Sequence, residues 1–392
     1  MNLLPARRGM LRFLVPLAVA AVVAGGLAFA SASRSDSATP TLPPRSAEQL
    51  LAEVAQARVP GLSGTVVSTA RLGLPELPNI AGRGGVSLTD LVSGSHTVRV
   101  WLKGEDKSRL AVTGSLAESD VIHNGKDLWL YSSHDNSVVH YRLSDQGEKA
   151  QTPATGVVPT PQQLSRQLLS ALSPTTEISV ERNLRVAGRD AYQLRLRPKA
   201  PESLIDSVVL AVDGQTKVPL RVQILAKGKG DPAVEVGFTQ VQFRAPADDV
   251  FQFTPPPGAK VTEKQAPSGG GHAGGGKAPA PTAPPARTAP PAPPASSVGP
   301  AVLGSSWTSV LVLRNVDLFS GSGADSGLAR ELLGSAAPVQ GAFGHGRMLR
   351  TTLLTVLLTD DGRVYAGAVT PAAIEAAAAR PLSEAKPLGG GR

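Results

Sequence analysis

The sequence predicts a mainly β protein of the α+β class, with about ten strands and two helices in residues 46–263. Three observations predict this fold. Short segments with apolar residues at every second position recur along this region, as in strands with two unlike faces. Turn-forming residues separate the segments. Two amphipathic helical patterns interrupt the series. This is more strand than an average domain contains.

The N-terminus has the pattern of an export segment. Three arginines, Arg7, Arg8 and Arg12, precede an apolar run over residues 13–30, and Ala30-Ser31-Ala32 offers a cleavage site. Residues 1–32 therefore form either a cleaved signal peptide or a single-pass membrane anchor, and both remain open. In either case the rest of the chain is exported, to the cell membrane surface or the cell wall space.

A tether and a helix are expected next. Residues 33–45 are polar and contain proline, which is typical of a tether. Ser46 and Gln49 have the spacing of a capping box, and the apolar residues that follow predict a helix ending near residue 60. Leu62–Thr69 is the first expected strand.

Residues 96–143 predict a meander of short antiparallel strands. Val98, Val100 and Leu102 alternate with polar or aromatic residues. Asn124-Gly125 accepts the positive φ angles of a type I′ hairpin turn. A further turn is expected at Asp135–Ser137.

A second helix and a second set of strands follow the meander. The helix is expected over residues 160–172 and ends at Pro174. The strands lie between residues 177 and 253, with one turn predicted at Gly188-Arg189-Asp190. Residues 265–299 are rich in Gly, Ala and Pro and predict a disordered linker.

Residues 300–387 predict a small α+β module. A strand is expected at Trp307–Leu313 and a short helix at Asp325–Leu333. Met348–Thr359 and Arg363–Val369 predict a hairpin turned at Asp361-Gly362, and Pro371–Ala379 predicts a final helix. About 88 residues suffice for a small core.

Composition and motifs exclude several function classes. The net charge is +8, but residues 46–264 carry 24 basic and 23 acidic side chains, so no basic patch for nucleic acid is expected. Cysteine is absent, which excludes disulfides and thiolate chemistry. No catalytic motif is found. We therefore expect no enzyme activity, no catalytic residue, no cofactor and no metal site.

Some polar and aromatic residues in the meander invite a functional interpretation, but structural roles are preferred. His134 and His140 lack the neighbouring ligands that zinc requires. Asp120 and Asp127 flank a hairpin and are interpreted as solvated turn residues, and Asp248-Asp249 as capping residues. Trp101, Trp129 and Tyr131 fall opposite the aliphatic stripe, where they either pack as core under a helix or form an exposed patch.

The order of these elements, with the closing run Phe251–Gly258 and the hairpins of Asp120–Tyr141, resembles the lipoprotein-carrier superfamily of LolA-like and RseB-like proteins. The resemblance covers residues 46–263. It implies an unclosed, strongly curved antiparallel sheet, related to a β-barrel, with helices over its concave face. It also implies that acyl chains are held between sheet and helices. The linker and the terminal module depart from a minimal carrier.

The resemblance therefore predicts a non-enzymatic, exported carrier that binds a lipid or a lipoprotein acyl chain. The alternative is an RseB-like envelope-stress regulator, in which residues 300–387 contact an anti-sigma factor or another membrane protein. Burial of a lipid chain contributes about 0.8 kcal/mol per methylene, so an apolar groove needs no polar contact to hold one. The expected lining residues, any one of which is also consistent with ordinary core, are Val100, Leu110, Leu130, Leu164, Leu168, Leu172, Leu194, Leu196 and Val222.

Overall fold

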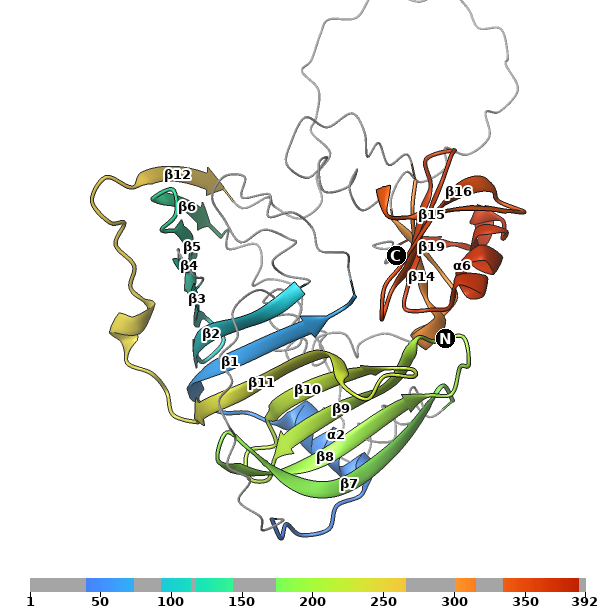
Figure 1. Ribbon diagram of the computed structural model, residues 1–392. Coiled ribbons are helices and arrows are strands. Elements are labelled where there is room, and N and C mark those ends of the chain that lie inside the picture. Colours follow the sequence, from blue (N-terminus) through green and yellow to red (C-terminus); the bar gives the residue numbers. More distant parts are fainter. Residues whose placement is uncertain are drawn as a thin grey trace, which may run out of the picture.

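The computed structural model describes residues 40–73, 93–113, 118–143, 174–265, 300–314 and 334–387. Within them the chain forms two β-sheets and few helices (Figure 1). The predicted signal or anchor segment, the predicted helices at 160–172 and Asp325–Leu333, and nearly all of the predicted linker lie outside the described residues. No helix in the described ranges has the length and hydropathy needed to cross a bilayer.

The main sheet has twelve strands in the order β12-β6-β5-β4-β3-β2-β1-β11-β10-β9-β8-β7. They are β1 (Gly61–Arg71), β2 (Ser93–Lys103), β3 (Lys107–Thr113), β4 (Glu118–Asn124), β5 (Asp127–Ser132), β6 (Ser137–Arg142), β7 (Thr176–Val186), β8 (Arg189–Pro198), β9 (Ile205–Asp213), β10 (Pro219–Ala226), β11 (Pro232–Gln242) and β12 (Lys260–Gln265). The order is linear, so β12 and β7 remain as two edges. In Figure 1, β3–β6 turn away from the plane of β7–β11. The prediction of a mainly β, unclosed and strongly curved sheet is confirmed.

One edge of the main sheet differs from the prediction of a purely antiparallel sheet. β12 runs parallel to β6, with Lys260 opposite Ser137 and Gln265 opposite Arg142. Residues 243–259, which we call the strap, connect β11 to β12. The strap carries the chain across the sheet before β12 begins, which brings β12 alongside β6 in the same direction (Figure 1).

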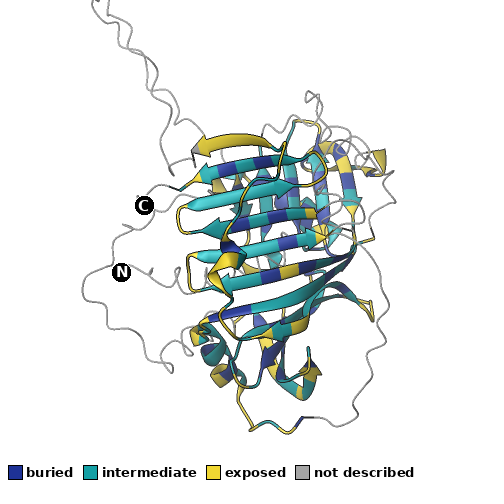
Figure 2. Cartoon of the chain, turned by 90° about the vertical axis from the view of Figure 1, so that its left-hand side faces the viewer, coloured by how far each residue is buried: buried dark blue, intermediate teal, exposed yellow. Residues whose placement is uncertain are grey.

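The strap lies over the outer face of β3–β6. Figure 2, which looks onto this face, shows it crossing in front of the strands. It contains the short 3-10 helix η2 (Asp248–Phe251), and the Phe251 side chain is fully buried. Phe251 and Phe253 were expected to close the last strand. They instead belong to the strap, and the final strand begins only at Lys260.

Two hairpin turns also differ from prediction. Asn124 is paired with Asp127, so the loop residues are Gly125 and Lys126. Only Gly125 has a positive φ, +64°, which fits a type II′ turn and not the predicted type I′. In the β7–β8 hairpin, Ala187 and Gly188 both have positive φ, so the turn lies one residue earlier than predicted.

The helix α2 (Ala47–Gln56) begins as predicted. Ser46 is its N-cap: Gln49 N donates to Ser46 Oγ and Ser46 N donates to Gln49 Oε1, which completes the capping box. Leu50 and Ala52 are buried. Lys217 Nζ, at the end of the β9–β10 hairpin, lies 3.5 Å from Glu53 Oε2 and helps to hold the helix on the sheet.

Two apolar clusters fill the bend of the main sheet. One contains Leu62, Val98 and Val100, and the other contains Val186, Ala191, Ala211 and Leu220. Phe238 and Phe243 pack against both clusters. The two halves of the curved sheet therefore share a continuous core through these two rings.

The second sheet has seven strands in the order β15-β16-β17-β18-β14-β13-β19. They are β13 (Ala301–Leu303), β14 (Val310–Leu313), β15 (Ala337–Gly341), β16 (Gly344–Arg350), β17 (Thr355–Thr359), β18 (Val364–Gly367) and β19 (Lys386–Pro387). The helices are η3 (Ser306–Thr308), α6 (Pro371–Ala378) and η4 (Leu382–Glu384). The predicted small α+β module and its final helix are confirmed.

Two strands of this module were predicted with wrong bounds. The segment predicted as one strand, Met348–Thr359, is two antiparallel strands, because the chain turns at Thr351–Leu354. Thr351 Oγ1 accepts hydrogen bonds from the Leu353 and Leu354 amides, which closes the turn. Trp307 lies in η3, ahead of the strand that was predicted to include it.

The second sheet is docked against the main sheet. Main-chain hydrogen bonds run from Leu204 N to Ala368 O (2.9 Å), from Thr370 N to Glu202 O (2.8 Å) and from Thr352 N to Leu72 O (2.7 Å). Leu353 of the second sheet is buried in an apolar cluster with Ala226 and Ala233 of the main sheet. Paired main-chain groups and a shared apolar cluster fix the position of the second sheet on the main sheet.

Candidate functional site

A row of aliphatic side chains crosses five strands of the main sheet. Val100 is opposite Leu110, which is opposite Val121. Val121 is in turn opposite Leu130, and Leu130 is opposite Val139. Directly opposite residues project from the same face of a sheet, so these five form what we call the aliphatic row. Three of them were predicted to line a ligand site, and the register brings those three together.

The aliphatic row is only partly covered. Val100 is buried, with 5% exposure, whereas Leu110, Val121, Leu130 and Val139 are half-buried. Figure 2 shows β5 in the teal of intermediate burial, and β3, β4 and β6 with buried positions between intermediate ones. An apolar surface that stays partly open to solvent has a favourable free energy to gain from contact with hydrocarbon.

The other half of the sheet continues the same face. A second series of directly opposite residues runs through Leu194, Leu210, Val222, Val236 and Ser68. Ser68 projects from the same face of β1 as Val66, and Val66 is opposite Val98. Val98 shares a face with Val100, so the predicted residues Leu194 and Val222 lie on the face of the aliphatic row. We call this the inner face.

The remaining predicted residues divide into two groups. Leu196 projects from the inner face and is opposite Val208, and it is half-buried like Val222. Leu194 is buried to 1% exposure. Leu164, Leu168 and Leu172, which were also predicted to line the ligand site, lie outside the described residues. The six predicted residues that the structure describes therefore share one face of the sheet.

The segment before α2 is fixed over the β7–β8 end of the inner face. Tyr192 projects from the same face as Leu194, and its Oη donates to Pro43 O at 2.8 Å. Burial raises the pKa of the Tyr192 phenol, so the hydroxyl remains a donor. Asn183 Nδ2 donates to Pro40 O at 3.2 Å. Residues 40–45, predicted as part of a tether, are thus held against the sheet.

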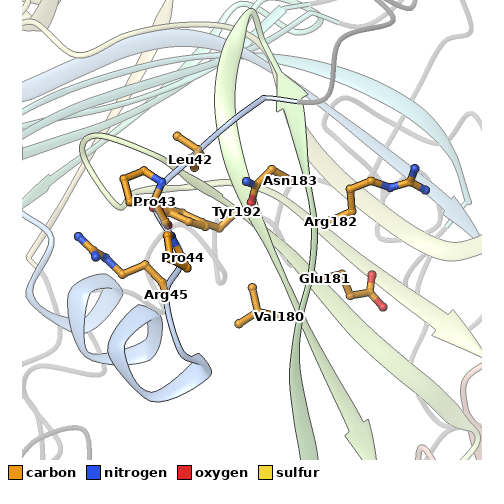
Figure 3. Close-up of a pocket in the computed structure, with 9 residues that line it drawn as sticks. All are labelled: Leu42, Pro43, Pro44, Arg45, Val180, Glu181, Arg182, Asn183 and Tyr192. Carbon is orange, nitrogen blue, oxygen red and sulfur yellow. The ribbon is translucent and has the colours of Figure 1, made fainter.

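A pocket of about 450 Å³ lies between this segment and the edge of the sheet (Figure 3). Its apolar lining comes from Leu42, Pro43, Pro44, Val180 and Tyr192, and its polar lining from Arg45, Glu181, Arg182 and Asn183. Figure 3 shows Tyr192 directed toward the proline segment, while the charged ends of Arg182 and Glu181 point away from it. The pocket is therefore an apolar recess with a charged rim at the end of the inner face.

The outer face of β2–β6 carries charged and aromatic groups beside the buried aliphatic side chains of Ile122 and Val138. Arg109 donates to Asp120 Oδ2 at 2.5 Å, and the Asp120 side chain is only 4% exposed. The prediction that Asp120 is a solvated turn residue is therefore wrong. Asp120 lies in the middle of β4, opposite Ala111 and Tyr131, and its charge is balanced by Arg109.

The aromatic residues of the outer face are covered by the strap. Phe253 lies 5.5 Å from the Trp129 ring and 5.8 Å from the Tyr131 ring. Trp101 has the guanidinium groups of Arg99 and Arg109 over its ring, at 4.9 and 5.7 Å. Of the two predicted roles, packing is correct for Trp129 and Tyr131, but the covering element is the strap and not a helix.

The strap is held by charge as well as by aromatic rings. Asp248 lies 2.5 Å from Lys107 Nζ and 2.9 Å from Lys103 Nζ. Hydrogen bonds from these two lysines lower the pKa of Asp248 to about 2. The predicted role of Asp248 as a capping residue is incomplete, because its main contacts are with the β2–β3 hairpin.

No group of three His, Asp or Glu side chains suited to a metal ion occurs in the part of the chain that the structure describes. The residues that sequence reasoning missed on the inner face are Val121 and Val139. Both alternate correctly within their strands, but only the register shows that they continue the aliphatic row. The position of the strap was not predicted, because nothing in its proline-rich sequence indicates that it packs on the outer face of the sheet.

Residues 86–263 match the model of the DUF2092 family, described as a predicted periplasmic protein. This match supports an extracytoplasmic location. With the curved sheet described above, it also supports the predicted resemblance of this part of the chain to the lipoprotein-carrier superfamily. No curated protein matches the chain.

Several solved structures are similar to the chain at low identity. The MucA/MucB complex of Pseudomonas aeruginosa matches with 19% identity over 86% of this chain and 98% of that chain, at a TM-score of 0.42. A LolA superfamily protein of Nitrosomonas europaea matches with 14% identity over 54% of this chain and 99% of that chain, at 0.22. The lipoprotein LppX of Mycobacterium tuberculosis matches with 11% identity over 51% of this chain and 98% of that chain, at 0.26.

Proposed function

We propose that this protein, whose main sheet resembles the lipoprotein-carrier superfamily, binds a lipid or a lipoprotein acyl chain on its inner face outside the cytoplasmic membrane. The aliphatic row is the observation that supports the proposal most directly. Five aliphatic side chains in successive strands lie directly opposite one another, and four of them are half-buried. A hydrocarbon chain laid along this row covers apolar surface without needing a polar contact.

The mechanism is reversible burial of the ligand with no covalent step. Each methylene transferred from water to the inner face contributes about 0.8 kcal/mol, so a chain of about ten buried methylenes gains about 8 kcal/mol before ordering costs. The remaining predicted lining residues, Leu194, Leu196 and Val222, extend the surface toward α2. We assign lipid binding to residues 46–264 and the lid role to Leu164, Leu168 and Leu172.

The proposal is tested by titrating a pyrene-labelled fatty acid into the full chain. Saturable binding at about one ligand per chain, reversed by an unlabelled phospholipid, supports it. A fluorescence increase that does not saturate, or no increase at all, contradicts it. The matched protein control is the Leu130→Gln variant, which keeps the strand but places an amide in the middle of the aliphatic row.

A second candidate function is favoured by the docking of the second sheet. Because main-chain hydrogen bonds join Leu204 to Ala368 and Leu72 to Thr352, the second sheet is positioned by the strands that carry the inner face. In this alternative the protein is an RseB-like regulator. Residues 300–387 contact an anti-sigma factor or another membrane protein, and the N-terminal segment anchors the chain in the membrane.

Photocrosslinking in cells distinguishes the two functions. A regulator loses its crosslinked membrane-protein partner when residues 300–392 are deleted, while lipid uptake is kept. A carrier has no such partner to lose. The crosslinker is placed at Arg347 and at Glu375, which are exposed or half-buried on the second sheet and its helix.

A further inference from the structure

The edge strand β12 is attached to the main sheet with very little side-chain packing. Residues 260–264 are all exposed, and Val261 has an exposed fraction of 46%. No residue of β12 belongs to an apolar cluster of the described residues. β12 is also the strand that pairs in parallel, an arrangement slightly less stable per residue than antiparallel pairing. Its attachment therefore depends on main-chain bonds and on a few polar contacts.

The strongest of these polar contacts is made by His140 of β6. Its Nδ1 lies 2.8 Å from Glu263 Oε2 of β12, and its Nε2 lies 2.7 Å from Asp127 Oδ1 of β5. The imidazole is 4% exposed and stacks on the Trp129 ring, with centroids 3.6 Å apart and planes 2° apart. Each nitrogen of the imidazole therefore faces one carboxylate oxygen, one from β5 and one from β12.

His140, Asp127 and Trp129 together form a site for one carboxylate from a neighbouring extended strand, which we call the His140 recess. Asp127 and Trp129 belong to β5 and hold the imidazole from the main-sheet side. Glu263, which is 61% exposed, is the single contribution of β12. If β12 leaves, the recess stays intact, because the other groups belong to the β5–β6 hairpin.

The neighbours of β12 in the chain have contacts of their own that do not involve β12. The strap before it is held separately, by the ion pairs of Asp248 with Lys103 and Lys107 and by the buried ring of Phe251. Asn136 also holds the strap, through a hydrogen bond to Pro257 O at 3.3 Å. The segment after β12 is rich in Gly, Ala and Pro. The second sheet keeps its own contacts with β9 and β1.

We propose that β12 occupies a strand-exchange site, and that a protein partner displaces it from the edge of β6 with an extended segment of its own. The partner segment carries an Asp or Glu at the position of Glu263, so that its carboxylate enters the His140 recess. Strand addition of this kind takes its affinity from main-chain hydrogen bonds and its specificity from alternate side chains. While β12 is in place, it protects an edge that would otherwise be open to unspecific pairing.

The ladder register gives a matched pair of test variants. Lys260 N donates to Asn136 O at 2.9 Å, so the amides of residues 260, 262 and 264 face β6, while those of 261 and 263 face away. Thr262→Pro removes a ladder donor and should release β12. Val261→Pro introduces the same residue where the amide faces outward, as edge strands tolerate, and should leave β12 in place.

The probe is a fluorescein-labelled peptide with the sequence of residues 258–265, added to the full chain and followed by anisotropy. The Thr262→Pro variant should bind it at least about tenfold more tightly than wild type or Val261→Pro, because only there is the edge vacant. A peptide with Glu263→Gln should bind at least about fivefold more weakly. A folded Thr262→Pro variant that ignores the peptide, or equal binding of both peptides, overturns the proposal.

Hydrogen exchange on the unmodified chain is a second test that needs no variant. The amides of Thr262 and Lys264 should exchange at least about a hundredfold faster than those of Val121 and Ile122 in the interior of the sheet. Equal protection of the two sets shows that β12 is an integral strand and overturns the proposal.

Discussion

Trp307 of the second sheet donates a hydrogen bond from its Nε1 to Thr176 Oγ1, the first residue of β7, at 2.7 Å. The neighbouring hydroxyls of Ser306 and Thr175 lie 2.9 Å apart. The second sheet is therefore in contact with β7 in addition to β1 and β9. Contacts with three separate strands of the main sheet define one orientation of the second sheet.

The contact of Leu353 with the main sheet leads to a first prediction. Leu353 is 9% exposed in the cluster with Ala226 and Ala233, so Leu353→Asp places an unpaired carboxylate in apolar surroundings. We expect the wild type to unfold in one calorimetric transition and Leu353→Asp in two. The neighbouring Leu354 is 39% exposed, and Leu354→Asp is the control that should keep one transition. One transition in both variants shows that the docking contact does not couple the sheets.

Ligand binding by the aliphatic row gives a second prediction. Leu110→Gln and Leu130→Gln replace half-buried aliphatic residues with amides that fit the strand but oppose hydrocarbon contact. We expect at least about a tenfold loss of affinity for a fatty acid, which corresponds to about 1.4 kcal/mol. Val261→Gln changes an aliphatic residue of β12 that is away from the row and should bind as wild type. Equal affinities in all three variants place the ligand elsewhere.

The buried ion pair of the outer face gives a third prediction. Arg109→Met leaves the carboxylate of Asp120 buried without its partner, so we expect about 3 kcal/mol of destabilisation in urea unfolding. The control is Arg99→Met, which removes the other guanidinium over the Trp101 ring. Arg99 is exposed and does not balance the charge of Asp120, so its loss should cost less than about 1 kcal/mol. The double variant Arg109→Met with Asp120→Leu should recover most of the loss. No recovery in the double variant contradicts the charge-balance argument.

Asp213 provides a pH-dependent prediction. Burial raises its pKa, but hydrogen bonds from Arg189 and from Thr216 outweigh burial and lower the pKa below the ordinary value of 3.8. A carboxylate with a lowered pKa in the folded state stabilises the fold above the unfolded pKa, and this contribution is lost as pH falls through the folded value. Asp213→Asn should therefore lower the free energy of unfolding by about 2 kcal/mol at pH 6.

The difference between wild type and Asp213→Asn should shrink below about pH 4, because the carboxyl of the unfolded state begins to take up a proton there while the folded carboxyl, with its lowered pKa, stays charged to lower pH. Urea unfolding at several pH values between 2.5 and 6 measures it. Asp231, which is exposed, supplies the control variant Asp231→Asn with little expected change at any pH. A difference for Asp213→Asn that does not depend on pH contradicts the linkage argument.

Most of the strand content could be predicted from the sequence because it depends on local alternation. Val98, Val100 and Leu102 alternate without interruption, and the capping box at Ser46 and Gln49 defines the start of α2. What alternation cannot supply is the register. The side-by-side placement of Val100 and Leu110 follows from the hairpin loops, which decide which residues are opposite one another.

The departures from prediction have a common cause in long-range contacts. Asp120 was expected to be solvated because it flanks a hairpin, yet Arg109 from the adjacent strand allows its burial. Phe251 and Phe253 alternate like strand residues, but their partners are the distant rings and strands of the outer face. The parallel pairing of β12 has no local signal, since it depends on the path of the strap. The lid residues Leu164, Leu168 and Leu172 lie outside the described residues and stay a prediction.

Native mass spectrometry of the full chain purified from a membrane-containing host tests the central claim most directly. We predict a bound species of lipid mass at about one per chain, released by organic extraction, and its loss in the Leu110→Gln and Leu130→Gln variants. A wild-type chain that carries no lipid and takes up none from added vesicles contradicts the claim that the inner face is a lipid-binding surface.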